Sequence, residues 1–377
     1  MISPRRPLLL CVVLLVALLV PTGSAGAQES LVVQRLAGPT RFDTAVEVAK
    51  AWVADECGFY AALGIEPYGT EQECLGGIPV GLDLSRGDSF ADALAIPTAA
   101  YHTHGPTFLT PPDQLWPGID QLASHFSGGV IYGSLDVVGQ QVADEIERRY
   151  GPANRLAGPD RYATSALAAR FNAEISSATD SWDFVSGMLL VSGEDWPDAL
   201  AVAALTSLGN PILLVRKNEI PAPAVDLIRQ YGSQGTTFGI IGGEAVISQN
   251  VIDQLRTLTN GPIYRRAGPD RTATARAIAD EYLQVTENSE RDTNGIILIR
   301  PDSFADAIAA PSLIHSRQAP IIIPATVTDL GQANIDWLTA NAGRLDTITT
   351  LGETDVVPDA IVQQAIDAIC AARDCNR

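Results

Sequence analysis

Three short motifs recur in the same order, three times over, along this chain of 377 residues. The opening motif reads R-x-A-G-P-x-R and begins at Arg35, Arg155 and Arg265, so its copies are almost evenly spaced. A middle motif, [SD]-[FW]-[AP]-D-A-[LI], occupies 89–94, 195–200 and 303–308, and a closing motif, G-x-x-x-V-[VI], occupies 133–138, 242–247 and 352–357. Such internal repetition indicates one structural module of roughly 115 residues that has been copied three times.

Within each copy, short apolar runs alternate with helical patterns. In the second copy, a short strand ends at Ala157, and buried strands are predicted at 188–191, 211–215 and 237–241. Helices are predicted after Asp160, which serves as a cap, from Asp195, and over 221–231 and 246–258. Equivalent strands are predicted at 108–109, 130–132, 321–323 and 347–349. The predicted fold class is α/β, with three tandem units of parallel sheet covered on both faces.

The N-terminal segment, 1–27, has the pattern of a secretory signal peptide. Arg5 and Arg6 precede an unbroken apolar run, Leu8–Val20, and small residues at Ala25 and Ala27 mark a cleavage site. The run is shorter than the about 20 residues that a membrane-spanning helix needs. We therefore expect secretion after cleavage before Gln28, with no membrane contact afterwards.

Glycine–proline pairs at 151–152 and 261–262 separate the copies. The predicted division of the chain is a signal peptide over 1–27 and three repeats over 28–150, 151–260 and 261–377. Three similar units in one chain suggest a compact pseudo-threefold arrangement, and we expect a monomer.

Charge limits the partners of the chain. The predicted signal peptide contains two arginines and no acidic residue, so its removal changes the net charge from −19 to −21. Such a surface repels nucleic acids and anionic membranes, and an anionic ligand must be bound at a local basic site. Solubility in a salty exterior is the alternative reason for the acidic surface.

Four cysteines remain after the predicted cleavage, and they lie in two local pairs. Cys57 and Cys74 flank a segment, Gly58–Glu73, that the other repeats lack, and Cys370 and Cys375 lie near the C-terminus. In an oxidising exterior each pair is expected to form a disulfide. A zinc site formed by both pairs is the weaker alternative.

At its three motifs the sequence resembles the type 2 cell-wall-binding repeat family. The resemblance covers roughly residues 31–373, and three tandem copies are usual in that family. It implies a flavodoxin- or Toprim-like fold for each repeat, three repeats around a pseudo-threefold axis, and non-covalent attachment to an anionic wall polymer, teichoic-acid-like or an acidic polysaccharide. Members often carry an effector domain, and we expect none here. The sequence departs from the family pattern at Arg266, Trp196-Pro197 and Ser134, which concerns ligand contacts and not the fold.

In each middle motif we predict a capping box at the start of a helix. The first residue can accept a hydrogen bond from a backbone N–H of the first turn, and the aspartate three residues later can reach back. The predicted capping residues are Ser89, Asp92, Asp195, Asp198, Ser303 and Asp306. Calcium coordination by the aspartates is the alternative. The acidic residue just before each motif (Asp88, Glu194 or Asp302) is either a solvated charge or a partner for an arginine.

Arginines are the predicted ligand-binding residues. The second arginine of each opening motif starts a helix, where backbone N–H groups and a guanidinium together suit phosphate or carboxylate. We call Arg41, Arg161 and Arg271 the helix-start arginines, and Arg35, Arg155 and Arg265, on the preceding strand, the strand arginines. An ion pair with the middle-motif aspartates or with the acidic residues just before them, within or between repeats, is an equally supported alternative.

The glycines of the opening motifs precede proline between a strand and a helix. We expect Gly38, Gly158 and Gly268 to supply a turn conformation that other residues avoid, and the proline to preset the helix entry.

The sequence argues against catalysis. His102, His104 and His125 lie in the first repeat and His315 in the third, so no histidine site can be common to the repeats. The Toprim D-x-D pair, the phosphate-loop motif and the G-x-G-x-x-G motif do not occur. We therefore expect no enzyme activity, no cofactor and no metal. A structural or interaction protein that binds a protein partner is the alternative function.

Overall fold

The computed structural model describes residues 30–62, 80–98, 105–178, 187–233, 235–287, 295–304 and 306–375. The predicted signal peptide lies outside these residues. Within the described ranges, no helix has the length and apolar character that crossing a membrane requires.

The second repeat shows how one module folds. Its own strands are buried almost throughout, as expected for strands covered on both faces: β6 (Gly187–Ser192), β7 (Ile212–Val215) and β8 (Thr237–Ile241). Its helices are α4 (Arg161–Ala178), α5 (Pro197–Ala201), α6 (Ala203–Thr206), α7 (Ala222–Gly232) and α8 (Gln249–Leu258). The helix expected from Asp195 is therefore two short helices, and the strand expected before Ala157 is β5 (Ala153–Leu156).

The other two repeats have the same alternation of four strands with helices, although the short helices between the strands differ. The first contains β1 (Val32–Leu36), α1 (Arg41–Ala62), β2 (Val80–Arg86), η1 (Ala93–Ala95), β3 (Thr107–Thr110), η2 (Pro117–His125), β4 (Phe126–Tyr132) and α3 (Gln140–Arg149). The third contains β9 (Ile263–Arg266), α9 (Arg271–Thr286), β10 (Gly295–Leu298), η3 (Ala307–Ala309), α10 (Ala310–Arg317), β11 (Ile321–Ile322), α11 (Gln332–Asn341), η4 (Ala342–Arg344), β12 (Thr347–Leu351) and α12 (Asp359–Ala372). The η elements are 3₁₀ helices.

The described strands form three sheets of four strands each, with the orders β3-β2-β4-β5, β7-β6-β8-β9 and β11-β10-β12-β1. Every strand pair is parallel. The predicted α/β fold of three parallel-sheet units is therefore confirmed.

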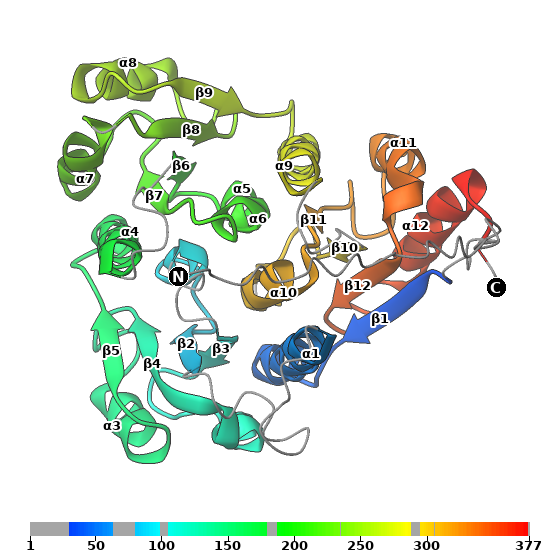
Figure 1. Cartoon of the computed structure of the whole chain (residues 1–377), viewed down its shortest axis with the longest axis horizontal. Coiled ribbons are helices and arrows are strands. Elements are labelled where there is room, and N and C mark those ends of the chain that lie inside the picture. The colour runs from blue at the N-terminus through cyan, green and yellow to red at the C-terminus, as the bar shows by residue number, and fades with distance from the viewer. Residues whose placement is uncertain are drawn as a thin grey trace, which may run out of the picture.

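The fourth strand of each sheet comes from a different repeat. β5 pairs with β4, β9 pairs with β8, and β1 pairs with β12. We call these three pairings the seams. Because β1, near the start of the chain, completes the sheet of the third repeat, backbone hydrogen bonds close the three repeats into a ring (Figure 1).

The seams also show that the sequence repeats and the sheets divide the chain differently. Each sheet takes in the opening strand of the next repeat, so the first two sheets extend to Leu156 and Arg266. The divisions at 150 and 260 remain a proposal for the units of sequence repetition. The unit that folds around one sheet is offset from that repeat by one strand.

The helices that follow the middle motifs pack together at the centre of the ring (Figure 1). α10 contacts α1 and α6, α5 and α6 contact α9, and η1 contacts α4. One continuous cluster of buried apolar side chains, with members such as Leu94, Leu205 and Leu313, draws on all three repeats. The pseudo-threefold body is therefore held by a shared core as well as by the seams.

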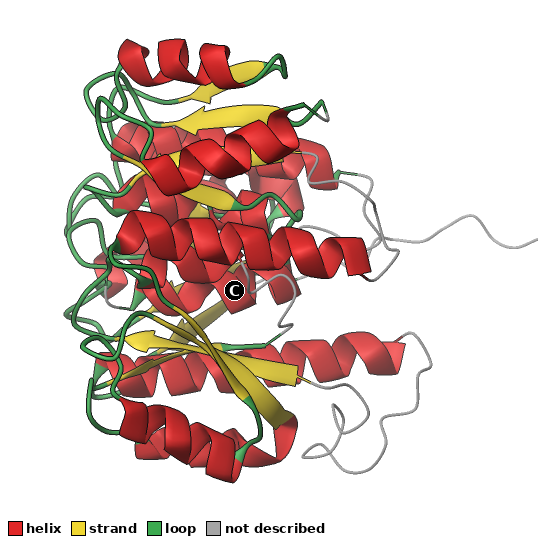
Figure 2. Cartoon of the chain, turned by 90° about the vertical axis from the view of Figure 1, so that its left-hand side faces the viewer, coloured by secondary structure: helices red, strands yellow, loops and turns green. Residues whose placement is uncertain are grey.

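The loops gather along one side of the molecule (Figure 2). The carboxyl ends of parallel strands lie at one edge of their sheet, so the opening motifs and the loops after β2, β6 and β10 share this edge. Ligands of open parallel α/β folds bind at the carboxyl ends of the strands. The fold thus places the recurring arginines on the side where a ligand is expected.

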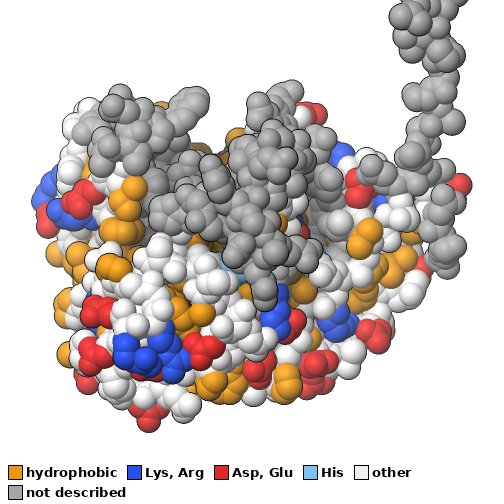
Figure 3. All heavy atoms as spheres, turned by 60° about the horizontal axis from the view of Figure 1, so that its bottom comes forward, with side chains coloured by type: hydrophobic (Ala, Val, Ile, Leu, Met, Phe, Trp, Pro, Cys, Tyr) orange, Lys and Arg blue, Asp and Glu red, His pale blue; other side chains and the backbone are white. Residues whose placement is uncertain are grey.

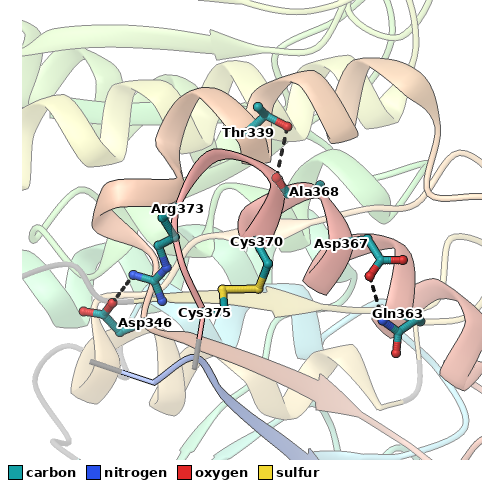
Figure 4. Close-up of a disulfide and its surroundings, with 8 residues drawn as sticks. All are labelled: Thr339, Asp346, Gln363, Asp367, Ala368, Cys370, Arg373 and Cys375. Atoms are coloured by element: carbon teal, nitrogen blue, oxygen red, sulfur yellow. Dashed lines mark hydrogen bonds and ion pairs between the residues drawn. A yellow bond between two sulfur atoms is a disulfide. The ribbon is translucent and has the colours of Figure 1, made fainter. Parts of the chain in front are cut away.

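Cys370 and Cys375 lie at the end of α12 (Figure 4). Their Sγ atoms are at bonding distance, and their Cα atoms are 5.3 Å apart. Arg373, between them, pairs with Asp346 just before β12 at 2.6 Å. The partner predicted for Cys57, Cys74, lies outside the described residues, so that bridge stays a prediction.

Candidate functional site

Each opening motif places an arginine at the first residue of a long helix. α1, α4 and α9 begin at the three helix-start arginines, as the sequence predicts. In the second and third repeats the preceding aspartate caps the helix. Asp160 accepts a hydrogen bond from the N–H of Ala163 at 2.9 Å, and Asp270 accepts one from Ala273 at 2.8 Å.

A threonine in the first helical turn ties each opening motif to its helix. The backbone N–H groups of Gly38, Gly158 and Gly268 donate to the hydroxyls of Thr44, Thr164 and Thr274 at 3.1–3.2 Å. Our expectation for these glycines is wrong, because none has a positive φ. A Cβ on Gly158 would lie 2.3 Å from the Cβ of Ala163, so glycine is required where the helix passes close to the loop.

Each helix-start arginine binds the loop that follows the second strand of its own repeat. Nη1 donates to the carbonyl of Gly87 at 2.7 Å in the first repeat, of Gly193 at 2.7 Å in the second, and of Pro301 at 3.0 Å in the third. A guanidinium has five N–H donors, so one such bond fixes its position and leaves further donors for a ligand.

Three aromatic side chains from the middle motifs meet where the repeats converge. The ring centroids of Phe90 and Phe304 are 5.6 Å apart, and those of Trp196 and Phe304 are 6.4 Å apart. We call these residues the axis cluster. The guanidinium of Arg161, from the second repeat, lies 5.2 Å from the ring centre of Phe90, from the first. These aromatics were not predicted to have a role, although an aromatic residue recurs at this position in every middle motif.

The capping boxes predicted for Ser89 with Asp92, Asp195 with Asp198, and Ser303 with Asp306 are wrong. η1 and η3 begin one residue after the aspartate, and in α5 the aspartate is the second residue, so none occupies the third helical position. At these three helix starts the structure shows no side-chain cap. The chain here winds into short helices around the axis cluster, which the local pattern does not reveal.

A reciprocal capping box occurs instead in the first opening motif. The backbone N–H of Thr40 donates to the Asp43 carboxylate at 3.1 Å, and the N–H of Asp43 donates to the Thr40 hydroxyl at 3.3 Å. In the middle motifs Ser89 accepts from the N–H of Ala91 at 3.4 Å. The spacing of three residues that indicates a capping box therefore occurs in both the opening and the middle motif of the first repeat. Only Thr40 and Asp43, in the opening motif, form the box.

The middle-motif aspartates pack against the closing motif of their own repeat. A Cβ on Gly242 would lie 2.7 Å from the carboxylate of Asp198, and the other two aspartates approach the equivalent glycines. Burial raises the pKa of Asp198 to about 6 and also raises the pKa of Asp306. The charge of Arg271 opposes the first shift and that of Arg41 opposes the second. Both arginines belong to a different repeat from the aspartate they face.

The ion pairs considered as the alternative to ligand binding are therefore not direct contacts. Arg271 and Arg41 act on Asp198 and Asp306 only through longer-range attraction. Among the described residues, no ion pair within 4.0 Å joins a helix-start arginine to a middle-motif aspartate. The acidic residues before the motifs do find arginine partners. Asp88 binds Arg86 at 2.6 Å and Asp302 binds Arg300 at 3.2 Å, and these hydrogen bonds lower the pKa of both carboxyls. Glu194 is exposed.

Each strand arginine forms a hydrogen bond across a seam. Its Nη1 donates to the carbonyl of the first closing-motif glycine, which is Gly352 for Arg35, Gly133 for Arg155 and Gly242 for Arg265. These glycines have φ values of 99°, 111° and 108°, a conformation that glycine adopts readily. Burial lowers the pKa of Arg155 and of Arg265. Arg35 also pairs with Asp359 at 2.8 Å.

In the described part of the chain, no cluster of three or more histidine, cysteine or acidic side chains could hold a metal ion. His125 is buried at the end of η2, where burial lowers its pKa. His102 and His104, and the side chain of His315, lie outside the described residues.

The three repeats match the model of the family Cell wall binding domain 2 (CWB2) over residues 35–143, 155–252 and 265–362. The chain therefore belongs to this family of cell-wall-binding domains, as the sequence motifs predict. Each match begins at a strand arginine, the residue that forms a bond across a seam.

Two curated relatives from Bacillus subtilis (strain 168) are similar in sequence. The chain is 26% identical to the N-acetylmuramoyl-L-alanine amidase LytC over 308 residues, which is 81% of this chain and 52% of the amidase. It is 25% identical to the protein named Amidase enhancer over 239 residues, 62% of this chain and 30% of that protein. The chain thus spans about half of the first relative and less of the second.

Two solved structures from Clostridium difficile share the fold. Cwp6 superposes with a TM-score of 0.70 at 21% identity over 90% of this chain and 48% of its own. Cwp8 superposes with a TM-score of 0.69 at 23% identity over 89% of this chain and 51% of its own.

Proposed function

We propose that this chain is a secreted, non-catalytic protein that attaches non-covalently to an anionic secondary polymer of a cell wall. The observation that carries the proposal is the helix-start arginine. In each repeat it is the first residue of a helix at the carboxyl edge of the sheet, with one N–H bonded to a loop carbonyl and further N–H groups left for a ligand. Membership of a cell-wall-binding family and similarity to an N-acetylmuramoyl-L-alanine amidase support the location.

The helix-start arginines are the proposed polymer contacts, and the strand arginines have a different part. All six were predicted to bind the ligand. The strand arginines are bonded to glycine carbonyls at the seams, and partial burial there lowers the pKa of Arg155 and Arg265. We therefore assign them to holding the repeats together.

Recognition of the polymer has to act at short range. The net charge of −19, or −21 after the predicted cleavage, cannot attract a polyanion from a distance. Figure 3 shows basic and acidic side chains next to one another on one face of the molecule. In physiological salt, charges are screened beyond about 8 Å, so the repulsion of the whole surface is limited and close arginine contacts decide the affinity.

The test is a pull-down with purified cell walls before and after chemical removal of their secondary polymer. We expect the full chain to bind intact walls, to lose that binding on stripped walls, and to be released by added salt. Equal binding to stripped walls would contradict the polymer assignment. Binding that needs a wall protein and resists salt would favour the alternative of a structural protein with a protein partner.

A further inference from the structure

The three repeats differ at the point where the first helix faces the helix after the third strand. The residue before that second helix is Trp116, Pro221 or Gly331 in the successive repeats. The residue after the helix-start arginine is Phe42, Tyr162 or Thr272. Both positions are therefore smallest in the third repeat.

In the first two repeats a large side chain covers this region. Phe42 stacks on Trp116 with ring centroids 4.9 Å apart, and the indole N–H of Trp116 donates to Asp43 at 3.0 Å. In the second repeat the guanidinium of Arg216 lies 4.3 Å from the ring centre of Tyr162.

The third repeat has an open cleft at the equivalent place. Its volume is about 390 Å³, which is within the range of about 300–1,000 Å³ typical of small-ligand sites. The lining comes from the start of α9, the start of α11 and the loop before it: Asp270, Arg271, Thr272, Arg276, Ala325, Gly331, Gln332 and Ala333.

A second arginine enters the cleft in this repeat alone. Arg276 occupies the position of Val46 and Ala166, which are buried apolar residues in the other repeats. Its Nη1 donates to Oδ1 of Asn334 at 2.7 Å. Asn334 is fully buried and is itself fixed, because its Nδ2 donates to the carbonyls of Ile323 at 2.9 Å and Leu330 at 2.7 Å. The guanidinium is therefore held in place before any ligand arrives.

The start of α11 adds backbone donors to the same cleft. Gln332 and Ala333 belong to its first turn, whose N–H groups come too early in a helix to be bonded within it. The equivalent turns of the first two repeats contain Pro117 and Pro223, each of which lacks an N–H. The third repeat thus combines two guanidinium groups with two backbone amides. The carboxylate of Asp270, which also lines the cleft, can accept a hydroxyl hydrogen.

We propose that this cleft binds one anionic sugar or polyol unit, with its phosphate or carboxylate group between Arg271, Arg276 and the start of α11, and a hydroxyl on Asp270. The assignment of that unit to a wall polymer rests on the function proposed above. The third repeat would then bind an end or a branch of the polymer, while the covered surfaces of the first two repeats contact it only from outside.

The test uses the full chain and two anionic probes, glycerol 3-phosphate and glucuronate, with glycerol and glucose as neutral counterparts. Binding is followed by NMR titration. Ala333→Trp fills the cleft from an exposed helix position, and Ala222→Trp makes the same change at an exposed first-turn position in the second repeat. Arg276→Gln removes a charge while keeping a donor for Asn334.

We expect the wild type and Ala222→Trp to bind at least one anion. The two cleft variants should bind it at least ten-fold more weakly, because Arg276→Gln loses a charge-assisted hydrogen bond and Ala333→Trp fills the space of the ligand. Preference for the phosphate or the carboxylate probe identifies the anionic group. Equal binding of the neutral probes, unchanged affinity in Ala333→Trp, or no anion binding by a wild type that still binds walls would overturn the cleft assignment. Loss of wall binding with intact, variant-sensitive anion binding would overturn the wall function alone.

Discussion

The strand arginines and the helix-start arginines look equivalent in the sequence and differ in the structure. Both recur in every repeat, at the two ends of the opening motif. The first set reaches across the seams to a glycine carbonyl of another repeat, whereas the second set binds a loop carbonyl of its own repeat at the carboxyl edge. Recurrence in a triplicated chain therefore marks two different settings, one where the repeats join and one at the carboxyl edge, where we propose that the ligand binds.

The largest effect is expected from the triple variant Arg41→Gln, Arg161→Gln, Arg271→Gln. If these residues bind the polymer, wall binding should fall at least a hundred-fold, because three charge-assisted hydrogen bonds of about 1.5–3 kcal/mol each are lost. Wall pull-down and the melting temperature are measured side by side. A strongly destabilised product, or full wall binding by a well-folded one, would place these arginines with the strand set.

The converse prediction concerns Arg155→Gln. This change removes the donor from the carbonyls of Gly133 and Ser134 at a half-buried seam. We expect the free energy of unfolding to fall by about 2 kcal/mol, with wall binding by the folded fraction unchanged. Urea unfolding gives the first quantity. Asn154→Gln, at the exposed neighbouring position of the same strand, is the control and should cost under about 0.5 kcal/mol. Weaker wall binding by folded Arg155→Gln would show that the strand set also contacts the ligand.

The sequence was sufficient for the strands and the long helices because their signals are local. The run Ile212–Val215 is apolar throughout and becomes a strand covered on both faces. The seams were not predictable in this way. Arg35 and Arg155 lie in nearly identical motifs, yet the strand of one pairs with a strand near the opposite end of the chain and the strand of the other pairs with the strand just before it.

The site was only partly predictable for a similar reason. That Arg161 starts a helix follows from the proline and the capping aspartate just before it. The pattern of Ser89 and Asp92 fits a capping box equally well. Tertiary packing instead places Phe90 in the axis cluster and Asp92 against Gly133 of the closing motif, and neither contact can be predicted from the local pattern. The cleft of the third repeat is open because Thr272 stands where the other repeats have Phe42 and Tyr162. A comparison of these three positions in the sequence could have indicated it.

A smaller effect is expected from pH, and it tests whether a helix-start arginine also supports the fold. Burial raises the pKa of Asp198 from 3.8 to about 6, while Arg271 acts in the opposite direction. Between these values the folded state binds the proton more tightly than the unfolded state, so this group contributes most stability below pH 4 and loses it as pH rises through 6. The loss should be about 1 kcal/mol between pH 5 and pH 8.

Urea unfolding at several pH values measures this dependence. Asp198→Asn should remove it. Arg271→Gln should move it to higher pH, because the positive charge that favours the carboxylate is gone. A profile that is identical in wild type and Asp198→Asn would contradict the assignment to this aspartate.

The smallest effect is expected where the ring closes. Arg35 donates to the carbonyl of Gly352 at 2.8 Å and pairs with Asp359, whose side chain is 81% exposed. An exposed ion pair contributes about 0–1 kcal/mol, so Asp359→Asn should change the free energy of unfolding by under about 0.5 kcal/mol. Arg35→Gln removes the carbonyl bond as well and should cost about 1 kcal/mol. We expect a larger cost at Arg155, because burial there lowers the pKa of the guanidinium and water replaces the lost donor less readily. Both are measured by urea unfolding under one set of conditions. If Asp359→Asn costs as much as Arg35→Gln, the ion pair and not the carbonyl bond stabilises this seam. That result would contradict the common role of the three strand arginines for Arg35.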